Sequence, residues 1–378
     1  KGYNIFAGWI SDELDMDVNE SLTISSLSHK YFIKQGCFDE VNQLSGVPQA
    51  FITKCMVGGR VMCSNNAKKQ CNDRVQDFDA VSLYPSAMSR IPGYLKNIPK
   101  VIENKSYDWL KFQNGYFVEV LVKSIGKCYE FPLASFIGES GVRQFTNDLK
   151  GKTLFLDKTA LEDLIEFQKI DFEIIRGYYF DDGFNTKVKE TVDFLFNKRV
   201  ALKKAGNPAQ EIYKLLMNSG YGKTLMKAPG VKTRFFGKEK ELDAHVFKNY
   251  NSIQAVQKLA DCKKWKVTQI IGIEKHFNLP HIGVIILSMS KRIMNEVMCT
   301  AEDNGVEVMY QDTDSMHIRE AEIEKLRVAY NKKYNRELIG SNMGQFHSDF
   351  SAEGMTNICS VKSIFLGKKS YVDLLEGT

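Results

Sequence analysis

Residues 306–318, VEVMYQDTDSMHI, place two aspartates at the tip of a hairpin pattern. The runs VEVMYQ and SMHI have the composition of buried strands, and the Asp-Thr-Asp triplet between them predicts a turn. Asp312 and Asp314 are two residues apart, so both side chains lie on one face of an extended chain. Two carboxylates held away from water repel each other unless a cation such as Mg²⁺ compensates them. An isolated Asp-x-Asp triplet is more often a solvated turn, so the rest of the sequence must decide between the two interpretations.

The composition is that of a globular protein. Of 378 residues, 43% are hydrophobic and 26% are charged, which excludes a disordered or fibrous chain. The length allows two or three domains, or one large domain with several lobes. The formal net charge of +5 favours a polyanionic partner without requiring one.

The eight cysteines contain no C-x-x-C pair and no spacing typical of zinc, so we expect free thiols in a reducing, intracellular compartment. No apolar run approaches transmembrane length, and the first residues do not resemble a signal peptide. We therefore expect a soluble protein that does not bind a membrane.

A second acidic strand lies far upstream of the hairpin. Residues 74–81, RVQDFDAV, alternate as a strand does, with Asp77 and Asp79 on one face. The next residues, SLYPSAM, turn the chain, because Pro85 suits the first turn of a helix. An acid therefore stands near the end of this strand, just before a helix begins.

Two helices joined by a tight turn lie between the acidic segments. Residues 186–204 carry apolar side chains at helical spacing and end at the sequence AGNP. A second helix is predicted to start after Asn207, a suitable N-cap, with Pro208 at its first position, and to run to Gly222. The two helices form an antiparallel hairpin.

The second helix has a chemical pattern on one face. Lys214, Asn218 and Tyr221 occupy positions i, i+4 and i+7. A lysine there can hold a triphosphate as a point charge, and a tyrosine can pack against a base pair. Arg199 and Lys203, four residues apart on the preceding helix, are candidates for further triphosphate contacts, although an exposed helix face explains them as well.

The remaining stretches are of three kinds. Residues from about 91 to 180 mix short strand patterns with one helix, DKTALEDLIEFQ, and are predicted to be mixed α/β. Residues from about 225 to 280 are polar and basic, and we expect an irregular insertion. The run HIGVIILSMSKRIMNEVMCTAED predicts a buried helix that ends at Asn304-Gly305.

Three segments, in chain order, resemble motifs A, B and C of the family B DNA polymerases. They are DAVSLYPS at 79–86, KLLMNSGYG at 214–222 and YQDTDS at 310–315. Three unrelated motifs in the right order are a specific signal. They favour the metal-site interpretation of the acidic hairpin over the solvated turn.

Two shorter segments extend the resemblance, which covers about residues 50 to 378. Lys369-Ser-Tyr371 resembles the K-x-Y motif at the boundary of palm and thumb. Gly58-Gly59 resembles the Y-x-G-G segment ahead of motif A, although Met56 stands in place of its tyrosine. The two inserted regions make the chain most similar to the viral and plasmid protein-primed branch.

The resemblance implies a template-directed DNA polymerase that adds dNTPs to a 3′-hydroxyl with two Mg²⁺ ions, for which Mn²⁺ can substitute. The implied catalytic and metal-binding residues are Asp79, Asp314 and, as a weaker ligand or charge-shaping neighbour, Asp312. Tyr84 is the implied gate against a ribose 2′-hydroxyl. The nucleotide-binding residues would be Tyr84, Arg199, Lys203, Lys214, Asn218 and Tyr221. The DNA-binding residues would be Gly58, Gly59, Ser219, Gly222, Lys369 and Tyr371.

The implied fold class is α+β: a right-hand polymerase palm with an antiparallel sheet, helical-hairpin fingers and inserted subdomains, with the exonuclease and most of the thumb outside this chain. The expected segments begin with a region preceding the palm (1–73, the end of an exonuclease-to-palm linker), followed by palm with motif A (74–90) and a palm insertion similar to terminal-protein region 1 (91–183). Fingers with motif B (184–224) and a second insertion (225–282) come next. The last segment is palm with motif C, K-x-Y and the start of the thumb (283–378). The implied partners are primer-template DNA, dNTPs and a terminal priming protein. We expect a monomer, and a segment that is weakly processive or inactive by itself.

Three other classes of protein share part of this pattern. A nucleotide-sugar transferase also uses an Asp-x-Asp metal pair, but it would not need Asp79 or the Lys214 helix face. The presence of all three candidate acids argues against a catalytically inactive, nucleic-acid-binding relic of a polymerase, but the expected absence of the exonuclease and most of the thumb from this chain keeps that alternative open. A reverse transcriptase usually has adjacent aspartates, whereas Thr313 separates them here.

Overall fold

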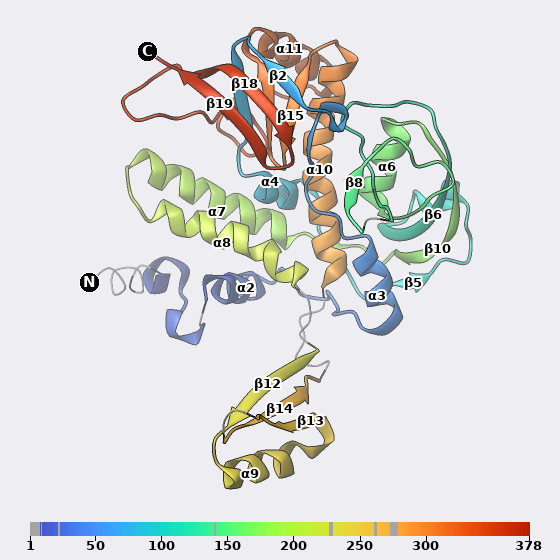
Figure 1. Ribbon diagram of the computed structural model, residues 1–378, viewed down its shortest axis with the longest axis vertical. Helices are drawn as coiled ribbons and strands as arrows, with labels where there is room; N and C mark the ends of the chain where they lie inside the picture. The colour runs from blue at the N-terminus through green and yellow to red at the C-terminus, as the bar shows by residue number, and fades with distance from the viewer. Residues whose placement is uncertain are drawn as a thin grey trace.

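The computed structural model describes residues 8, 10–21, 23–139, 141–226, 230–260, 263–272 and 279–378 (Figure 1). Its largest sheet is antiparallel and has eight strands. Six of them follow the order β1 (Val61–Cys63), β15 (Val308–Asp312), β16 (Ser315–Arg319), β3 (Val75–Ala80), β18 (Cys359–Gly367) and β19 (Ser370–Glu376). The other two are β17 (Phe346–Ser348), which pairs with β3, and β2 (Lys69–Cys71), which pairs with β18. The predicted acidic hairpin and the predicted acidic strand are therefore neighbours in one sheet.

A long central helix, α10 (Pro280–Asp303), connects the parts of the molecule. In Figure 1 it stands upright with the large sheet on one side and the first insertion on the other. Its side chains are buried around almost its whole circumference, as expected for a helix that is packed on several sides. The predicted end is confirmed, because Asn304 caps the helix and Gly305 has a φ of +63°.

The first insertion has a sheet and a hydrophobic core of its own. The strand order is β5 (Lys100–Val101), β10 (Ile170–Phe180), β6 (Gly115–Ile125) and β9 (Thr153–Asp157). The predicted helix is α6 (Lys158–Glu166), so the mixed α/β prediction is confirmed. The smaller elements of this region are β4 (Tyr94–Leu95), which pairs with β11 (Phe184–Asn185), α5 (Tyr107–Leu110), and the paired strands β7 (Ser135–Ile137) and β8 (Arg143–Phe145).

The predicted helical hairpin consists of α7 (Lys187–Lys204) and α8 (Gln210–Gly222). The second helix begins two residues later than predicted. Asn207 is not its N-cap, although the Asn207 side chain accepts a hydrogen bond from the Ala209 amide in the preceding turn. A short turn, η3 (Lys223–Leu225), follows α8. Helix α2 (Ile24–Lys34) packs along α8.

The prediction of an irregular second insertion was wrong. Residues in this region form a three-stranded sheet in the order β12 (Val231–Phe236), β14 (Trp265–Ile270), β13 (Ile253–Lys258), with α9 (Glu239–Asn249) and the turn η4 (Tyr250–Ser252). Its small core includes Val267 and Leu242, and most other side chains of its strands are exposed. A sheet that buries so few apolar residues has a weak alternation signal, which is why the sequence pattern did not reveal it. Figure 1 shows this unit set apart from the rest of the molecule.

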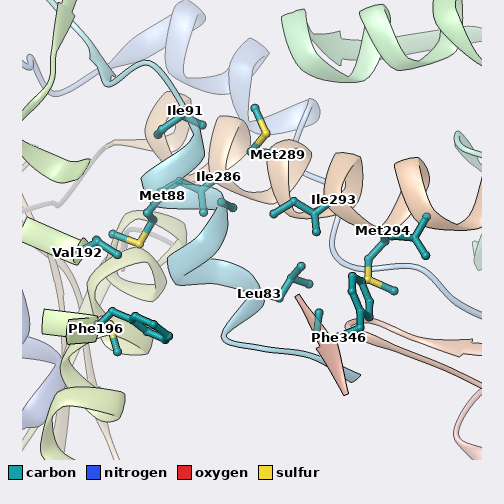
Figure 2. Close-up of a cluster of buried hydrophobic side chains, with 14 of the residues drawn as sticks. Leu83, Met88, Ile91, Val192, Phe196, Ile286, Met289, Ile293, Met294 and Phe346 are labelled. Atoms are coloured by element: carbon teal, nitrogen blue, oxygen red, sulfur yellow. The ribbon is translucent and has the colours of Figure 1, made fainter. Parts of the chain in front are cut away.

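The helix after the acidic strand, α4 (Leu83–Arg90), is held between α10 and α7. Figure 2 shows Met88 directed toward Val192 and Phe196 of α7, while Leu83 lies near Ile293 of α10 and near Phe346 of β17. Leu83 is 3% exposed and Met88 is fully buried. Burial of a side chain of this size contributes about 1.5–3 kcal/mol, so the start of α4 is firmly fixed beside the strand that carries Asp79.

The remaining elements are η1 (Val18–Glu20), α3 (Gly46–Lys54), η2 (Ser64–Asn66), η6 (Glu320–Glu322) and α11 (Ile323–Tyr334). The seven cysteines in the described ranges are free, and Cys262 lies outside them. None of the helices in the described part of the chain is long and apolar enough to cross a membrane.

Candidate active site

Asp79 and Asp314 meet where β3 pairs with β16. In this antiparallel ladder Asp79 is opposite Ser315, the residue directly after Asp314. The Ala80 amide donates a hydrogen bond to the Asp314 carbonyl oxygen at 2.9 Å. Two acids that are 235 positions apart in sequence are thus brought together by strand register.

The turn between β15 and β16 is tight. Thr313 has a φ of +60°, an uncommon value for a residue with a branched side chain. The Asp314 amide donates to the Asp312 carbonyl at 2.7 Å, and the Thr313 amide donates to the Arg60 carbonyl at 2.9 Å. The strained residue is therefore held by a neighbouring segment, as expected where a strained backbone persists.

The two meeting carboxylates have perturbed proton affinities. Burial is the largest cause that raises the pKa of Asp79, to about 7, and repulsion from Asp314 is the next. Asp77 and Asp349 add further repulsion, while the Lys214 ammonium opposes these effects. Burial likewise raises the pKa of Asp314, with Asp312 adding repulsion and Lys369 opposing it. The site gathers more negative charge than its own cations compensate.

Asp312 is bound differently from the other two acids. Its carboxylate is bonded to the Lys369 ammonium, and the Tyr310 hydroxyl donates to it at 3.3 Å. The Thr313 hydroxyl donates at 3.4 Å to Oδ1, the oxygen that Lys369 binds, while Tyr310 is bonded to Oδ2. Asp312 is therefore engaged by protein groups, whereas the main effect of Asp314 on Asp79 is repulsion between their charges.

The donor set suits Mg²⁺. Within the ranges that the structure describes, no group of three or more His, Cys, Asp or Glu side chains is placed to hold a metal ion, so the protein offers two carboxylates and not a ready three-carboxylate cluster. Two half-buried carboxylates with excess negative charge fit a hard cation that takes one or two carboxylates and fills its other positions with water and phosphate oxygens. Asp79 and Asp314 would hold such an ion, and Asp312 lies beside them.

The motif B helix brings Tyr221 onto Tyr84. Their rings are stacked with centroids 4.2 Å apart and planes 18° apart. Burial is the main cause that raises the pKa of both phenols. Lys214 and Asn218 lie exposed on the same helix, and the Lys214 charge reaches Asp79. Lys214 and Tyr221 therefore lie near the acidic pair, since the Asp314 charge also acts on Tyr221, while Asn218 is exposed on the same helix.

The two candidates on α7 differ in their surroundings. Arg199 donates to the Ser82 hydroxyl at 3.0 Å and to the Gln210 side chain at 3.3 Å. It therefore connects α7 to the residue before α4 and to the first turn of α8. Lys203, one turn further along α7, is exposed.

The K-x-Y segment packs against motif C. The Lys369 amide donates to the Tyr310 hydroxyl at 2.9 Å, and the Lys369 ammonium binds Asp312. The Tyr371 ring lies 5.0 Å from the ring of Tyr310 and is 38% exposed. Lys369 and Tyr371 thus lie at the edge of the acidic site, with part of the tyrosine open to solvent.

The predicted glycine positions are of two kinds. A Cβ on Gly59 would stand 2.5 Å from the Thr313 methyl group, so only glycine fits there without a shift. Gly58 and Gly222 have no neighbouring atom within 4 Å of such a Cβ. Ser219 is partly exposed on α8. Gly59 has a packing role that the sequence did not reveal, whereas Gly58, Ser219 and Gly222 lie at or near the surface.

Several residues of the site were not predicted. Asp349 adds charge next to Asp79, and buried His317 bonds to Asp373 at 3.1 Å and faces Asp77. Arg60 is 3% exposed, and its carbonyl accepts a hydrogen bond from the Thr313 amide in the turn between Asp312 and Asp314. A basic residue directly after Gly58-Gly59 was a visible signal, but its burial depends on tertiary contacts.

The fold is that of the palm of a right-hand polymerase. Two solved structures of Phi29 DNA polymerase share it, one complexed with primer-template DNA (18% identical, TM-score 0.64) and one complexed with single-stranded DNA (19% identical, TM-score 0.65). Each comparison covers 98% of this chain and 57% of the solved chain. The predicted α+β class is confirmed.

The chain belongs to the type B DNA polymerases of the organellar and viral kind, whose family model matches residues 2–304. A DNA polymerase of Kluyveromyces lactis is 23% identical over 360 residues, which are 94% of this chain and 34% of that protein. A DNA polymerase of Acidianus bottle-shaped virus is 43% identical over 214 residues, covering 53% of this chain and 31% of that protein. The chain therefore spans about a third of the length of these relatives, and the resemblance stated from its motifs is confirmed.

Proposed function

We propose that this chain is the catalytic core of a template-directed DNA polymerase that adds dNTPs to a 3′-hydroxyl. The observation that carries the proposal is the meeting of Asp79 and Asp314 on adjacent strands, with the pKa of Asp79 raised to about 7. A protein that keeps two repelling carboxylates half-buried gains most from them when a cation is bound.

Two Mg²⁺ ions, when bound, would supply charge neutralisation on the triphosphate and activation of the attacking hydroxyl. Asp79 and Asp314 would be the ligands of these ions, and Asp312 would change the net charge around them. Lys214 holds the triphosphate as a point charge, assisted by Arg199 and Lys203.

The stacked pair of Tyr84 and Tyr221 forms the floor of the nucleotide site. Tyr221 packs against the nascent base pair, Tyr84 excludes a ribose 2′-hydroxyl, and Asn218 borders the same site. The stacked geometry supports this assignment, since the stack fixes the two rings together and leaves an outer ring face as a flat apolar surface.

DNA lies along the exposed edge of the site. Lys369 and Tyr371 hold the primer terminus, and the template backbone passes Gly58, Gly59, Ser219 and Gly222, where small side chains permit close approach. The insertions at 91–183 and 225–282 grip a terminal priming protein and DNA outside the site, and the protein acts as a monomer. Similarity of the fold to Phi29 DNA polymerase supports this arrangement.

The test is incorporation of labelled dNTP by the whole protein that contains this chain. We would compare wild type, Asp314→Asn and the matched control Asp148→Asn, an exposed acid of the first insertion that pairs with Lys152. Each would be assayed on a primed template and with a candidate terminal protein.

We expect Asp314→Asn to lower the rate on the order of a thousandfold, because it removes several kcal/mol of charge stabilisation, and the control to match wild type. Metal-dependent incorporation by wild type rules out an inactive relic. Loss of extension in Asp79→Ala rules out a nucleotide-sugar transferase. An Asp314→Asn protein with wild-type rate would contradict the proposal.

A further inference from the structure

The Arg60 guanidinium is buried without a directly bonded carboxylate, although the charges of Asp163 and Glu302 act on it from a greater distance. It is 3% exposed, and none of the ion pairs in the described ranges includes it. Nε donates to the Gln311 side-chain oxygen at 2.5 Å, and one terminal nitrogen donates to the carbonyls of Phe131 and Pro132 at 3.0 and 2.9 Å. The other terminal nitrogen is 3.4 Å from the Met298 sulfur. The direct bonds of this cation are therefore made to neutral groups from three separate elements.

On one side, Arg60 is hydrogen-bonded to the acidic turn, which is the turn of Asp312, Thr313 and Asp314 between β15 and β16. The Arg60 carbonyl accepts the Thr313 amide at 2.9 Å, and the next residue, Val61, is paired with Asp312. Gln311, which receives the guanidinium bond, also reaches the Thr313 carbonyl at 3.5 Å. Main chain and side chain of one residue thus hold the turn between Asp312 and Asp314.

On the other side, Arg60 holds the loop of residues 129–132, which belongs to the first insertion. This loop is fastened to the rest of the molecule at several points. The Glu130 carbonyl accepts the Asn65 amide at 2.9 Å, and the Glu130 amide donates to the Glu302 carboxylate at 3.0 Å. The Tyr129 hydroxyl donates to Asp303 at 3.1 Å. The loop is therefore a firm anchor for the guanidinium.

Burying the charged Arg60 guanidinium costs desolvation free energy. Burial lowers the pKa of its guanidinium to about 10, so the group is still charged at neutral pH. Apolar replacements of similar size at such buried sites are often neutral or stabilising, which makes stability alone a weak reason for an arginine here. The planar fork can instead hold several acceptors at fixed angles, which an apolar side chain cannot do.

We propose that Arg60 is a positioning residue that joins the turn of Asp312 and Asp314 to loop 129–132. The seating of the first insertion on α10 then sets the place of Asp314 relative to Asp79. A ligand that grips the insertion therefore acts on the metal-binding turn through Arg60. This inference deepens the proposed polymerase function and rests on it.

The test compares Arg60→Met with Arg292→Met in the whole protein that contains this chain. Arg292 is a matched control, since it is a largely buried arginine on α10 that binds Asp163 and Glu162, away from the acidic turn. Two readouts do not depend on activity. They are amide hydrogen exchange across residues 309–316 and Mn²⁺ binding followed by electron paramagnetic resonance. The third readout separates kcat from KM for dNTP.

We expect Arg60→Met to speed exchange of the Thr313 amide about tenfold, to weaken Mn²⁺ binding about tenfold and to lower kcat with little change in KM. Arg60→Lys keeps the charge but loses the fork, so it should fold and show smaller changes of the same kind. Arg292→Met should speed exchange in residues 158–166 and leave Mn²⁺ affinity unchanged.

Unchanged exchange and Mn²⁺ affinity in Arg60→Met would overturn the inference, as would equal effects of Arg60→Met and Arg292→Met on the turn. If Arg60→Met fails to fold, Arg60→Lys decides, and wild-type exchange in that variant overturns the inference. Failure of the proposed function looks different. In that case wild type itself would bind no Mn²⁺ and extend no primer, while the exchange comparison would still report whether Arg60 holds the turn.

Discussion

Replacing Asp79 by Asn should stabilise the metal-free protein above neutral pH. The pKa of this carboxyl is raised from 3.8 to about 7 in the folded protein. Since the folded state holds the proton more tightly than the unfolded state, stability is greatest below about pH 4, declines up to about pH 7 and is constant above it. The whole shift corresponds to about 4 kcal/mol of unfolding free energy. Partial exposure of the side chain screens the repulsion, so we expect about 1–2 kcal/mol.

The assay is thermal unfolding of wild type and Asp79→Asn in a chelating buffer at about pH 8 and at about pH 4. Asp79→Asn should raise the midpoint by about 1–3 °C at the higher pH and leave it unchanged at the lower pH, because the wild-type carboxyl is protonated there. Asp148→Asn, which removes an exposed acid, is the control. Added Mg²⁺ should stabilise wild type more than Asp79→Asn. A variant less stable than wild type at about pH 8 without metal would refute the reasoning, since it would mean that burial and repulsion do not destabilise the charged Asp79 carboxylate.

Three further predictions concern the residues around the acidic pair. Tyr84→Ala should destabilise the stack with Tyr221 by about 0.5–1.5 kcal/mol and increase incorporation of ribonucleotides, measured as the ratio of kcat/KM for rNTP and dNTP; an unchanged ratio would contradict the gate assignment. Lys214→Met should raise KM for dNTP about tenfold, and steady-state kinetics with an unaltered KM would exclude a triphosphate contact. Gly59→Ala should lower the thermal midpoint by about 1–4 °C and weaken Mn²⁺ binding, because its Cβ would displace Thr313. Gly58→Ala has open space and should keep the wild-type midpoint, so equal midpoints for both variants would be inconsistent with this packing.

The elements that carry the acids could be predicted because their sequence patterns are local. Alternation in residues 74–81 and the turn at Asp312 to Asp314 define two short strands and a hairpin without reference to the rest of the chain. The helix face of Lys214 and Tyr221 follows in the same way from a period of 3.6 residues. Motif order then supplied what local patterns could not, namely that these pieces belong to one site.

The supporting contacts could not be predicted because they depend on tertiary packing. Nothing in the sequence shows that Arg60 is buried, or that Gly59 lies against Thr313, since both facts arise when β1 pairs with β15. Asp349 approaches Asp79 only through β17, a strand of three residues. The second insertion was missed for another reason, since its small core gives no clear period in the sequence.

The most direct test of the account is Mn²⁺ titration of wild type, Asp79→Asn, Asp314→Asn, Asp312→Asn and the double variant of Asp79 and Asp314. If Asp79 and Asp314 share one metal platform, each single variant should weaken binding about tenfold or more, the double variant should lose little beyond that, and Asp312→Asn should have the smallest effect. Wild-type affinity in Asp79→Asn or Asp314→Asn, or losses that multiply as for independent sites, would contradict the account.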